Sequence, residues 1–168
     1  MEYLRRTQRK MRLFRREQEF EVFSPVKGSA IPLSEVNDGV FSEELLGKGC
    51  AIRPESETVT SPVNGKVEMV FPTGHAVGVK SDDGVEVLIH IGLETVNMNG
   101  DGFETHVKQG DSVKAGDPLV TFSKEKIEKA GYDPVTMVII SNTKDFKEVK
   151  LLKLGSIETK EALLQIVK

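Results

Sequence analysis

The chain has 168 residues, enough for one domain with a sizeable core, and its 38% hydrophobic and 29% charged residues are ordinary for a globular protein. The net charge of −3 is unevenly spread, because residues 1–20 carry +4 (seven basic against three acidic side chains) and residues 21–168 therefore carry −7. This acidic body argues against nucleic-acid binding, and the lack of an apolar run of about 18 residues argues against a transmembrane helix.

Residues 1–19 form a basic segment without Gly or Pro, distinct in composition from the rest of the chain. Leu4, Met11 and Phe14 share one helical face, so the segment is compatible with a partly helical tail. It lacks the apolar core of a secretory signal, and Cys50 is the single cysteine, which together predict a cytoplasmic protein. A frayed tail, weak contact with an anionic membrane surface and, less favoured, contact with nucleic acid remain open for residues 1–19.

From residue 20 onward, short β-like runs alternate with turns such as Asp82-Asp83-Gly84 and Asn99-Gly100. This texture predicts one all-β domain over residues 20–168, a mostly antiparallel sandwich or barrel with one or two short helices. A short helix is expected at Lys124–Ala130, ending at Gly131, and a single turn at Ser42–Leu46. The expected strands are 20–23, 58–61, 65–71, 76–80, 85–91, 106–107, 118–122 and 136–141.

Residues 84–96 read GVEVLIHIGLETV and contain His90. In a strand Val85, Val87, Ile89 and Ile91 lie on one face, the natural core face, which leaves Glu86, Leu88 and His90 on the other. An apolar Leu beside an ionisable His on the outer face indicates a contact surface.

A second histidine, His75, comes directly after Phe71-Pro72-Thr73-Gly74. A hairpin that turns at residues 82 and 83 places His75 roughly opposite His90. The Thr73 hydroxyl can accept a ring N–H from His75 and so select its tautomer. The third histidine, His106, lies in a polar stretch and is expected to be an ordinary surface residue.

Two adjacent imidazoles leave three interpretations open from spacing alone. They could be packed surface histidines, a nucleophile with its supporting group, or an incomplete metal site that lacks further local ligands.

Several motifs narrow this choice. The His90 segment resembles the active-site signature of the glucose-type enzyme IIA family of the bacterial phosphoenolpyruvate-dependent sugar phosphotransferase system. The resemblance extends over residues 20–168, in SPVKGSAIPLSEVNDGVFSEELLGKGCAI (24–52), TVTSPVNGKVEMVFPTGHAVGV (58–79) and GDGFETHVKQGDSVKAGDPL (100–119). It implies a stand-alone β-sandwich phosphotransferase that needs no cofactor.

The resemblance also implies roles for individual residues. His90 would accept a phosphoryl group on Nε2 from the histidine-containing phosphocarrier protein and pass it to a cysteine of the IIB domain of a membrane sugar permease. His75 would stabilise the transferred group, Thr73 would orient His75, and the backbone carbonyl of Gly92 would orient His90. Zinc would bind at His75 and His90 only if a partner protein supplied a carboxylate.

The family's docking surface is a shallow apolar depression around the two histidines with an acidic rim. The matching positions here are Asp38, Val40, Phe41, Leu45, Leu46, Phe71, Leu88, Glu94 and Val96. Glu94 stands where Asp is more usual, and Leu88 and Ile91 stand where the family has aromatics. Charge and apolarity are kept, so docking is expected to be retained, with room for a different partner preference.

Other classes fit less well. Residues 107–119 also resemble part of a biotinyl or lipoyl carrier domain, but the lysine such domains present in a tight turn is missing. Zinc peptidases of a related fold need a His-x-His pair, which this chain lacks. The remaining alternative is a regulatory binding module for transporters or kinases, switched by phosphorylation of His90.

Overall fold

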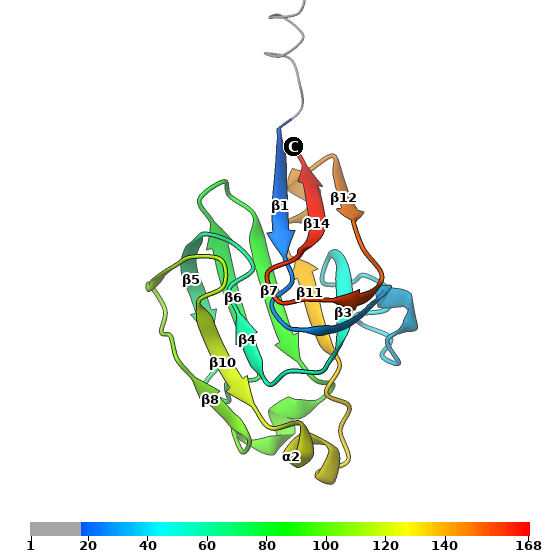
Figure 1. Cartoon of the computed structure of the whole chain (residues 1–168), viewed down its shortest axis with the longest axis vertical. Coiled ribbons are helices and arrows are strands. Elements are labelled where there is room, and N and C mark those ends of the chain that lie inside the picture. Colours follow the sequence, from blue (N-terminus) through cyan, green and yellow to red (C-terminus); the bar gives the residue numbers. More distant parts are fainter. Residues whose placement is uncertain (1–17) are drawn as a thin grey trace, which may run out of the picture.

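Strands are the main secondary structure in the computed structural model, which describes residues 18–168 (Figure 1). Helical structure in this part of the chain is limited to α2 (Lys124–Lys129) and the 3-10 turns η1 (Leu33–Glu35), η2 (Thr95–Met98) and η3 (Thr143–Asp145). The strands are β1 (Glu19–Phe23), β2 (Gly28–Ile31), β3 (Lys48–Pro54), β4 (Thr58–Thr60), β5 (Gly65–Val70), β6 (Ala76–Ser81), β7 (Glu86–Ile91), β8 (Phe103–Thr105), β9 (Ser112–Val113), β10 (Pro118–Phe122), β11 (Thr136–Ile140), β12 (Glu148–Leu151), β13 (Gly155–Ile157) and β14 (Ala162–Val167).

The strands form one large sheet and two small ones, with antiparallel pairing throughout the described ladders. The large sheet has the order β13-β2-β3-β11-β7-β6-β5-β9, and the small sheets have the orders β1-β14-β12 and β4-β10-β8. In Figure 1 the sheet of β1, β14 and β12 lies at the top of the molecule, and β10 and β8 of the other small sheet lie at the lower left. The main core joins side chains of all three, such as Leu164, Leu119 and Ile89, so the protein is a β-sandwich, as the sequence predicts.

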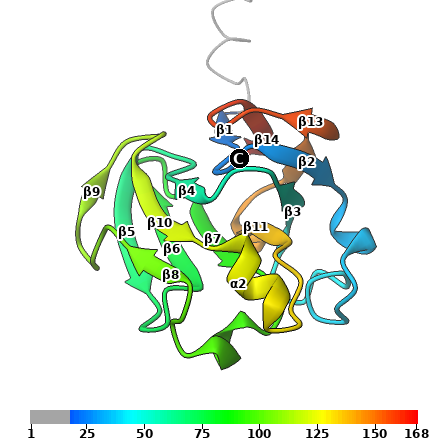
Figure 2. The same cartoon turned by 60° about the horizontal axis from the view of Figure 1, so that its bottom comes forward.

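The outer face of the large sheet carries a second, smaller core. It contains Met137 and Ile139 of β11, Ala51 of β3, and Leu33, Val36 and Phe41 from the link between β2 and β3. Figure 2 shows this link in light blue, outside β3. The link therefore covers β3 and β11, and Phe41 in its middle reaches the outer face of β7, where the strand pattern predicts a contact surface.

Helix α2 agrees closely with the sequence signals. The Ser123 side chain caps its start by accepting the Lys126 N–H at 3.2 Å, and Gly131, with φ of +87°, ends it in a conformation that favours glycine. The expected helix is confirmed, and Ser42–Leu46 forms turns.

One expected strand is wrong. Residues 106–107 are not a strand, because β8 ends at Thr105 and the chain then leaves the ladder toward the turn at residues 108–111, although His106 N–H still donates to the Leu119 carbonyl. The strands that were not among the expected runs are β2, β3, β8, β9, β12, β13 and β14. The burial of β14 does not alternate, so it has no period-two signal. Within residues 18–168 no helix is long and apolar enough to span a membrane.

Candidate functional site

The β6–β7 hairpin brings two histidines together. The ring centroids of His75 and His90 are 5.0 Å apart, with the rings at 79°. The expected register is wrong by one residue, since His90 pairs with Ala76. The cause is the turn, where Ser81 N–H donates to the Val85 carbonyl and encloses the three residues 82–84. His75 lies just before β6, so the direction of its side chain is not set by the alternation of faces along that strand, and its ring contacts that of His90.

His90 lies on the outer face of β7, as its position in the alternating pattern predicts, and is partly buried. Its Nδ1 lies 2.8 Å from the carbonyl oxygen of Gly92. A carbonyl can only accept, so Nδ1 carries the hydrogen and Nε2 of the neutral ring holds a lone pair. The ring of Phe41 packs against His90 with centroids 5.0 Å apart.

The surroundings of His90 keep its ring neutral. The pKa of His90 is lowered from 6.5 to about 4, chiefly by burial and then by the positive charge that His75 can carry, while the Gly92 carbonyl and the Asp38 carboxylate act in the opposite direction. At neutral pH the ring is therefore an unprotonated imidazole, the form that can act as a nucleophile.

His75 is 4% exposed, and its Nδ1 is hydrogen-bonded to the Thr73 hydroxyl, the contact that the sequence predicts. Phe71 packs against the ring at a centroid distance of 5.2 Å. Burial lowers the pKa of His75 as well. The backbones of the two histidine segments are joined directly, since Ile91 N–H donates to the His75 carbonyl at 2.7 Å.

Four apolar side chains are unusually exposed in the two segments that flank the site, the β2–β3 link that carries Phe41 and the turn after His90. Leu45 is 68% exposed, and Val40, Leu46 and Val96 are each more than 40% exposed. We refer to these four residues as the apolar rim. Single exposed apolar residues are common on protein surfaces, but a group of them indicates a protein contact.

The other expected docking residues have structural contacts. Phe41 is buried and Leu88 packs on the second core, so both support the sheet and the wall beside His90. The Asp38 carboxylate accepts the N–H groups of Val40 and Phe41, at 2.6 and 3.1 Å, and so fixes the turn that presents the apolar rim. Glu94 is exposed and has φ of 58°, a left-handed conformation uncommon for a residue other than Gly.

The turn after His90 is held by residues to which no role was expected from the sequence. Thr95 is fully buried there, and the Val135 and Asp133 carbonyls accept the N–H groups of Gly92 and Leu93 at 2.8 and 3.0 Å. The only local sign of a buried residue in this turn was a threonine directly after the charged Glu94. The partners at residues 133–135 have no such sign, because they are distant from the turn in the sequence.

Other places in residues 18–168 offer less chemistry. No group of three or more potential metal-ligating side chains is present there, so a zinc ion at His75 and His90 would need ligands from another protein. His106 is exposed, as expected, with Nε2 2.6 Å from the Thr121 hydroxyl.

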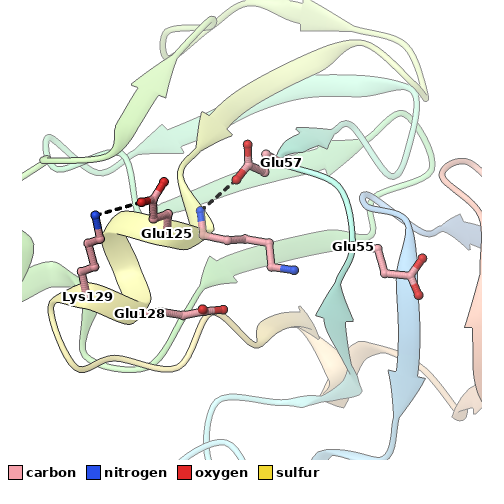
Figure 3. Close-up of a pocket in the computed structure, with 6 residues that line it drawn as sticks. Glu55, Glu57, Glu125, Glu128 and Lys129 are labelled. Atoms are coloured by element: carbon pink, nitrogen blue, oxygen red, sulfur yellow. Dashed lines mark hydrogen bonds and ion pairs between the residues drawn. The ribbon is translucent and has the colours of Figure 1, made fainter.

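A hollow lies between residues 55–57 and α2 (Figure 3). Two of its four carboxylates are engaged, since Glu57 accepts the backbone N–H of Lys124 at 3.1 Å and Glu125 pairs with Lys129 at 2.8 Å. Its lining contains no imidazole, thiol or hydroxyl nucleophile among the described residues. The lining residues are Glu55, Glu57, Lys124, Glu125, Glu128 and Lys129.

The fold and the site define a β-sandwich protein that sets a neutral, backbone-oriented histidine, a group able to act as a nucleophile, beside a second histidine. Comparisons with known proteins identify the family. The sequence model of the phosphoenolpyruvate-dependent sugar phosphotransferase system, EIIA 1, matches residues 20–146.

Individual relatives agree. The chain is 44% identical over 154 residues to the PTS system glucose-specific EIIA component of Oceanobacillus iheyensis, covering 91% of this chain and 93% of that protein. It is 50% identical over 145 residues to the PTS system beta-glucoside-specific EIIBCA component of Bacillus subtilis, covering 86% of this chain but 24% of that protein. It is also similar to the solved glucose permease IIA from Mycoplasma capricolum, with a TM-score of 0.80, 38% identity, and coverage of 88% of this chain and 96% of that one.

The chain therefore belongs to the EIIA family of the sugar phosphotransferase system, a family of phosphoryl-transferring components. It spans about a quarter of the EIIBCA relative and nearly all of the glucose-specific EIIA relative.

Proposed function

We propose that His90 is the phosphoryl acceptor of this chain and reacts through Nε2. The observation that carries this proposal is the hydrogen bond from His90 Nδ1–H to the Gly92 carbonyl at 2.8 Å, together with a pKa lowered to about 4. The first places the lone pair on Nε2, and the second keeps that lone pair free at neutral pH.

The transfer step balances without a cofactor. Nε2 of His90 attacks the phosphorus of a donor phosphohistidine, the new N–P bond forms as the donor's N–P bond breaks, and the donor ring leaves with the electron pair. The His90 ring becomes positively charged and retains its Nδ1 hydrogen, so the Gly92 carbonyl stabilises the product more strongly than the neutral reactant. In the next step a cysteine thiolate attacks the same phosphorus, and His90 leaves as neutral imidazole.

His75 is proposed to stabilise the phosphoryl group. The dianionic phosphoryl group raises the pKa of an imidazole next to it, which opposes the effect of burial on His75. Once protonated, His75 donates through Nδ1–H to the Thr73 hydroxyl and through Nε2–H to a phosphoryl oxygen. Thr73 thereby orients the ring, and the two histidines have different roles because only His90 has its Nδ1 tied to a carbonyl.

The apolar rim is the proposed docking surface for two successive partners, the histidine phosphocarrier protein and the IIB domain of a sugar permease. Support comes from its exposure beside the histidines and from the net charge of −7 on residues 21–168, which attracts a basic partner. Relatives whose names combine EII B, C and A in one component support the IIB partner. Asp38 and Glu94 are proposed as the acidic edge.

The test is to incubate the purified protein with phosphoenolpyruvate, enzyme I and the phosphocarrier protein, and to locate the phosphoryl group by mass spectrometry at mildly alkaline pH. His90→Ala should abolish labelling, and His75→Ala should still be labelled, but more slowly. The matched control is His106→Ala, because His106 is also hydrogen-bonded to a threonine hydroxyl yet lies outside the site.

Labelling of a folded His90→Ala variant at the wild-type rate would overturn the assignment, and absence of label on folded wild type would overturn the carrier function of this chain. Phosphorylation-switched binding to transporters or kinases, a cytoplasmic location and zinc shared with a partner stay predictions. Weak membrane contact through residues 1–19 also stays a prediction, and residues 1–17 lie outside the described part of the chain.

A further inference from the structure

The turn after His90 contains two consecutive peptide planes, and in each plane both the N–H and the C=O group are hydrogen-bonded. In the Ile91–Gly92 plane, the Gly92 N–H donates to the Val135 carbonyl at 2.8 Å, and the Ile91 carbonyl accepts the hydroxyl hydrogen of Thr95. In the Gly92–Leu93 plane, the Leu93 N–H donates to the Asp133 carbonyl at 3.0 Å. The carbonyl of this second plane is the acceptor for His90 Nδ1–H.

These contacts fix the direction of the one carbonyl that sets the His90 tautomer. A peptide plane held at a single end can rotate about its neighbouring bonds, whereas a plane held at both ends has one orientation. Of these four hydrogen bonds, two are made with the backbone carbonyls of Val135 and Asp133 and one with the His90 ring. The fourth comes from a side chain, the Thr95 hydroxyl.

Thr95 also packs tightly against the turn. It is fully buried, and a Cβ added at Gly92 would lie 2.4 Å from its Cγ2 methyl. Gly92 and Glu94 on either side of Leu93 both have positive φ values, of 78° and 58°. Glycine adopts this conformation without strain, whereas Glu94 holds it only because its surroundings impose it, and the methyl and hydroxyl of the next residue, Thr95, pack against this turn.

We propose that Thr95 is a positioning residue for phosphoryl transfer, acting on His90 through the peptide plane of Ile91 and Gly92. Without the hydroxyl, the Ile91 carbonyl loses its partner in a buried place and the plane rotates to find another. The Gly92 carbonyl then moves away from Nδ1, and the ring populates the Nε2–H tautomer, which has no lone pair on Nε2 to attack phosphorus. The catalytic consequence rests on the proposed function of His90.

The experiment compares Thr95→Val, which keeps the shape but loses the hydroxyl, with Thr95→Ser, which keeps the hydroxyl. The first readout is the pair of ¹⁵N chemical shifts of the His90 ring in the unphosphorylated protein, which report which nitrogen carries the hydrogen. The second is the rate of phosphorylation by the phosphocarrier protein. Thr60→Val is the matched control, because Thr60 is a buried threonine whose hydroxyl donates to the Pro25 carbonyl at 3.2 Å.

We expect Thr95→Val to shift His90 toward the Nε2–H tautomer and to lower the phosphorylation rate by about tenfold, the usual scale for loss of a group that orients a reacting histidine. Thr95→Ser should retain the Nδ1–H tautomer and most of the rate, and Thr60→Val should change neither. Thr95→Ala provides the same readouts without added volume if the valine variant folds poorly.

An unchanged tautomer and an unchanged rate in the folded hydroxyl-free variants would overturn the proposal, and so would equal losses in the serine and valine variants. The tautomer readout does not depend on phosphorylation. If wild type accepts no phosphoryl group, the proposed function fails, while the ¹⁵N shifts still decide whether Thr95 orients His90.

Discussion

The lowered pKa of His90 makes a quantitative prediction about stability. Its folded value of about 4 lies below the ordinary 6.5, chiefly because of burial. Between these two pH values the unfolded chain binds a proton that the folded protein does not, so stability falls as the pH drops from 6.5 and the loss is complete below about 4. Above pH 6.5 both states are neutral at this residue and the contribution is constant.

The size of the effect depends directly on the shift. Each pKa unit corresponds to about 1.4 kcal/mol, so the fall from 6.5 to about 4 is worth about 3 kcal/mol at full protonation. By the same linkage relation, about 2 kcal/mol of this loss is reached at pH 5. Carboxylates also titrate in this range, so the His90 contribution must be read from a difference between two proteins.

The assay is urea unfolding of wild type and His90→Asn at pH 7 and pH 5, with an NMR titration of the His90 ring. The asparagine amide can still donate to the Gly92 carbonyl, so the variant removes the titrating group while keeping that contact. We expect wild type to lose about 2 kcal/mol more than the variant between the two pH values. Equal losses, or a ring that titrates near its ordinary value, would contradict the role assigned to burial.

Three further perturbations concern the site and the core. Gly92→Ala should lower the free energy of unfolding by about 2 kcal/mol, measured in urea, because the new Cβ would lie 2.4 Å from the Thr95 methyl at φ of +78°; unchanged stability would contradict this. Thr73→Val should slow phosphorylation by about tenfold with little change in Tm, because His75 loses its hydroxyl partner; a normal rate would count against that role. Burial raises the pKa of Cys50 to about 12, so iodoacetamide should label it at pH 8 only in denaturant, as mass spectrometry would report.

Local patterns were sufficient for several parts of the fold. The alternation in β7 correctly placed Ile89 in the core and His90 on the outer face, because side-chain direction in a strand depends only on its two-residue period. Helix α2 was predicted with its end at Gly131, where the positive φ that ends the helix favours glycine, because such an end signal is local in the sequence. The hairpin also correctly brought His75 to His90, since a tight turn links adjacent strands.

Predictions that depended on geometric detail were less successful. The register was off by one because the turn contains three residues, and sequence composition alone does not distinguish a two-residue from a three-residue loop here. The expected strand at 106–107 was wrong because a hydrophobic residue in a short polar stretch carries little periodic information. Phe41 fits the docking pattern in sequence but is buried against His90 in the fold.

Residue types and close neighbours were enough to predict which side chains are candidates for the reaction, where the β6–β7 hairpin turns, and which face of β7 carries His90. The neutral state of His90 and the place of its lone pair on Nε2 depend instead on tertiary contacts. Phe41 contributes to the burial from the β2–β3 link, and the turn that presents the Gly92 carbonyl is anchored by Val135 at the entry to β11. Both partners lie more than forty residues from the groups they contact, so the chemistry of the imidazole depends on long-range packing that no local pattern encodes.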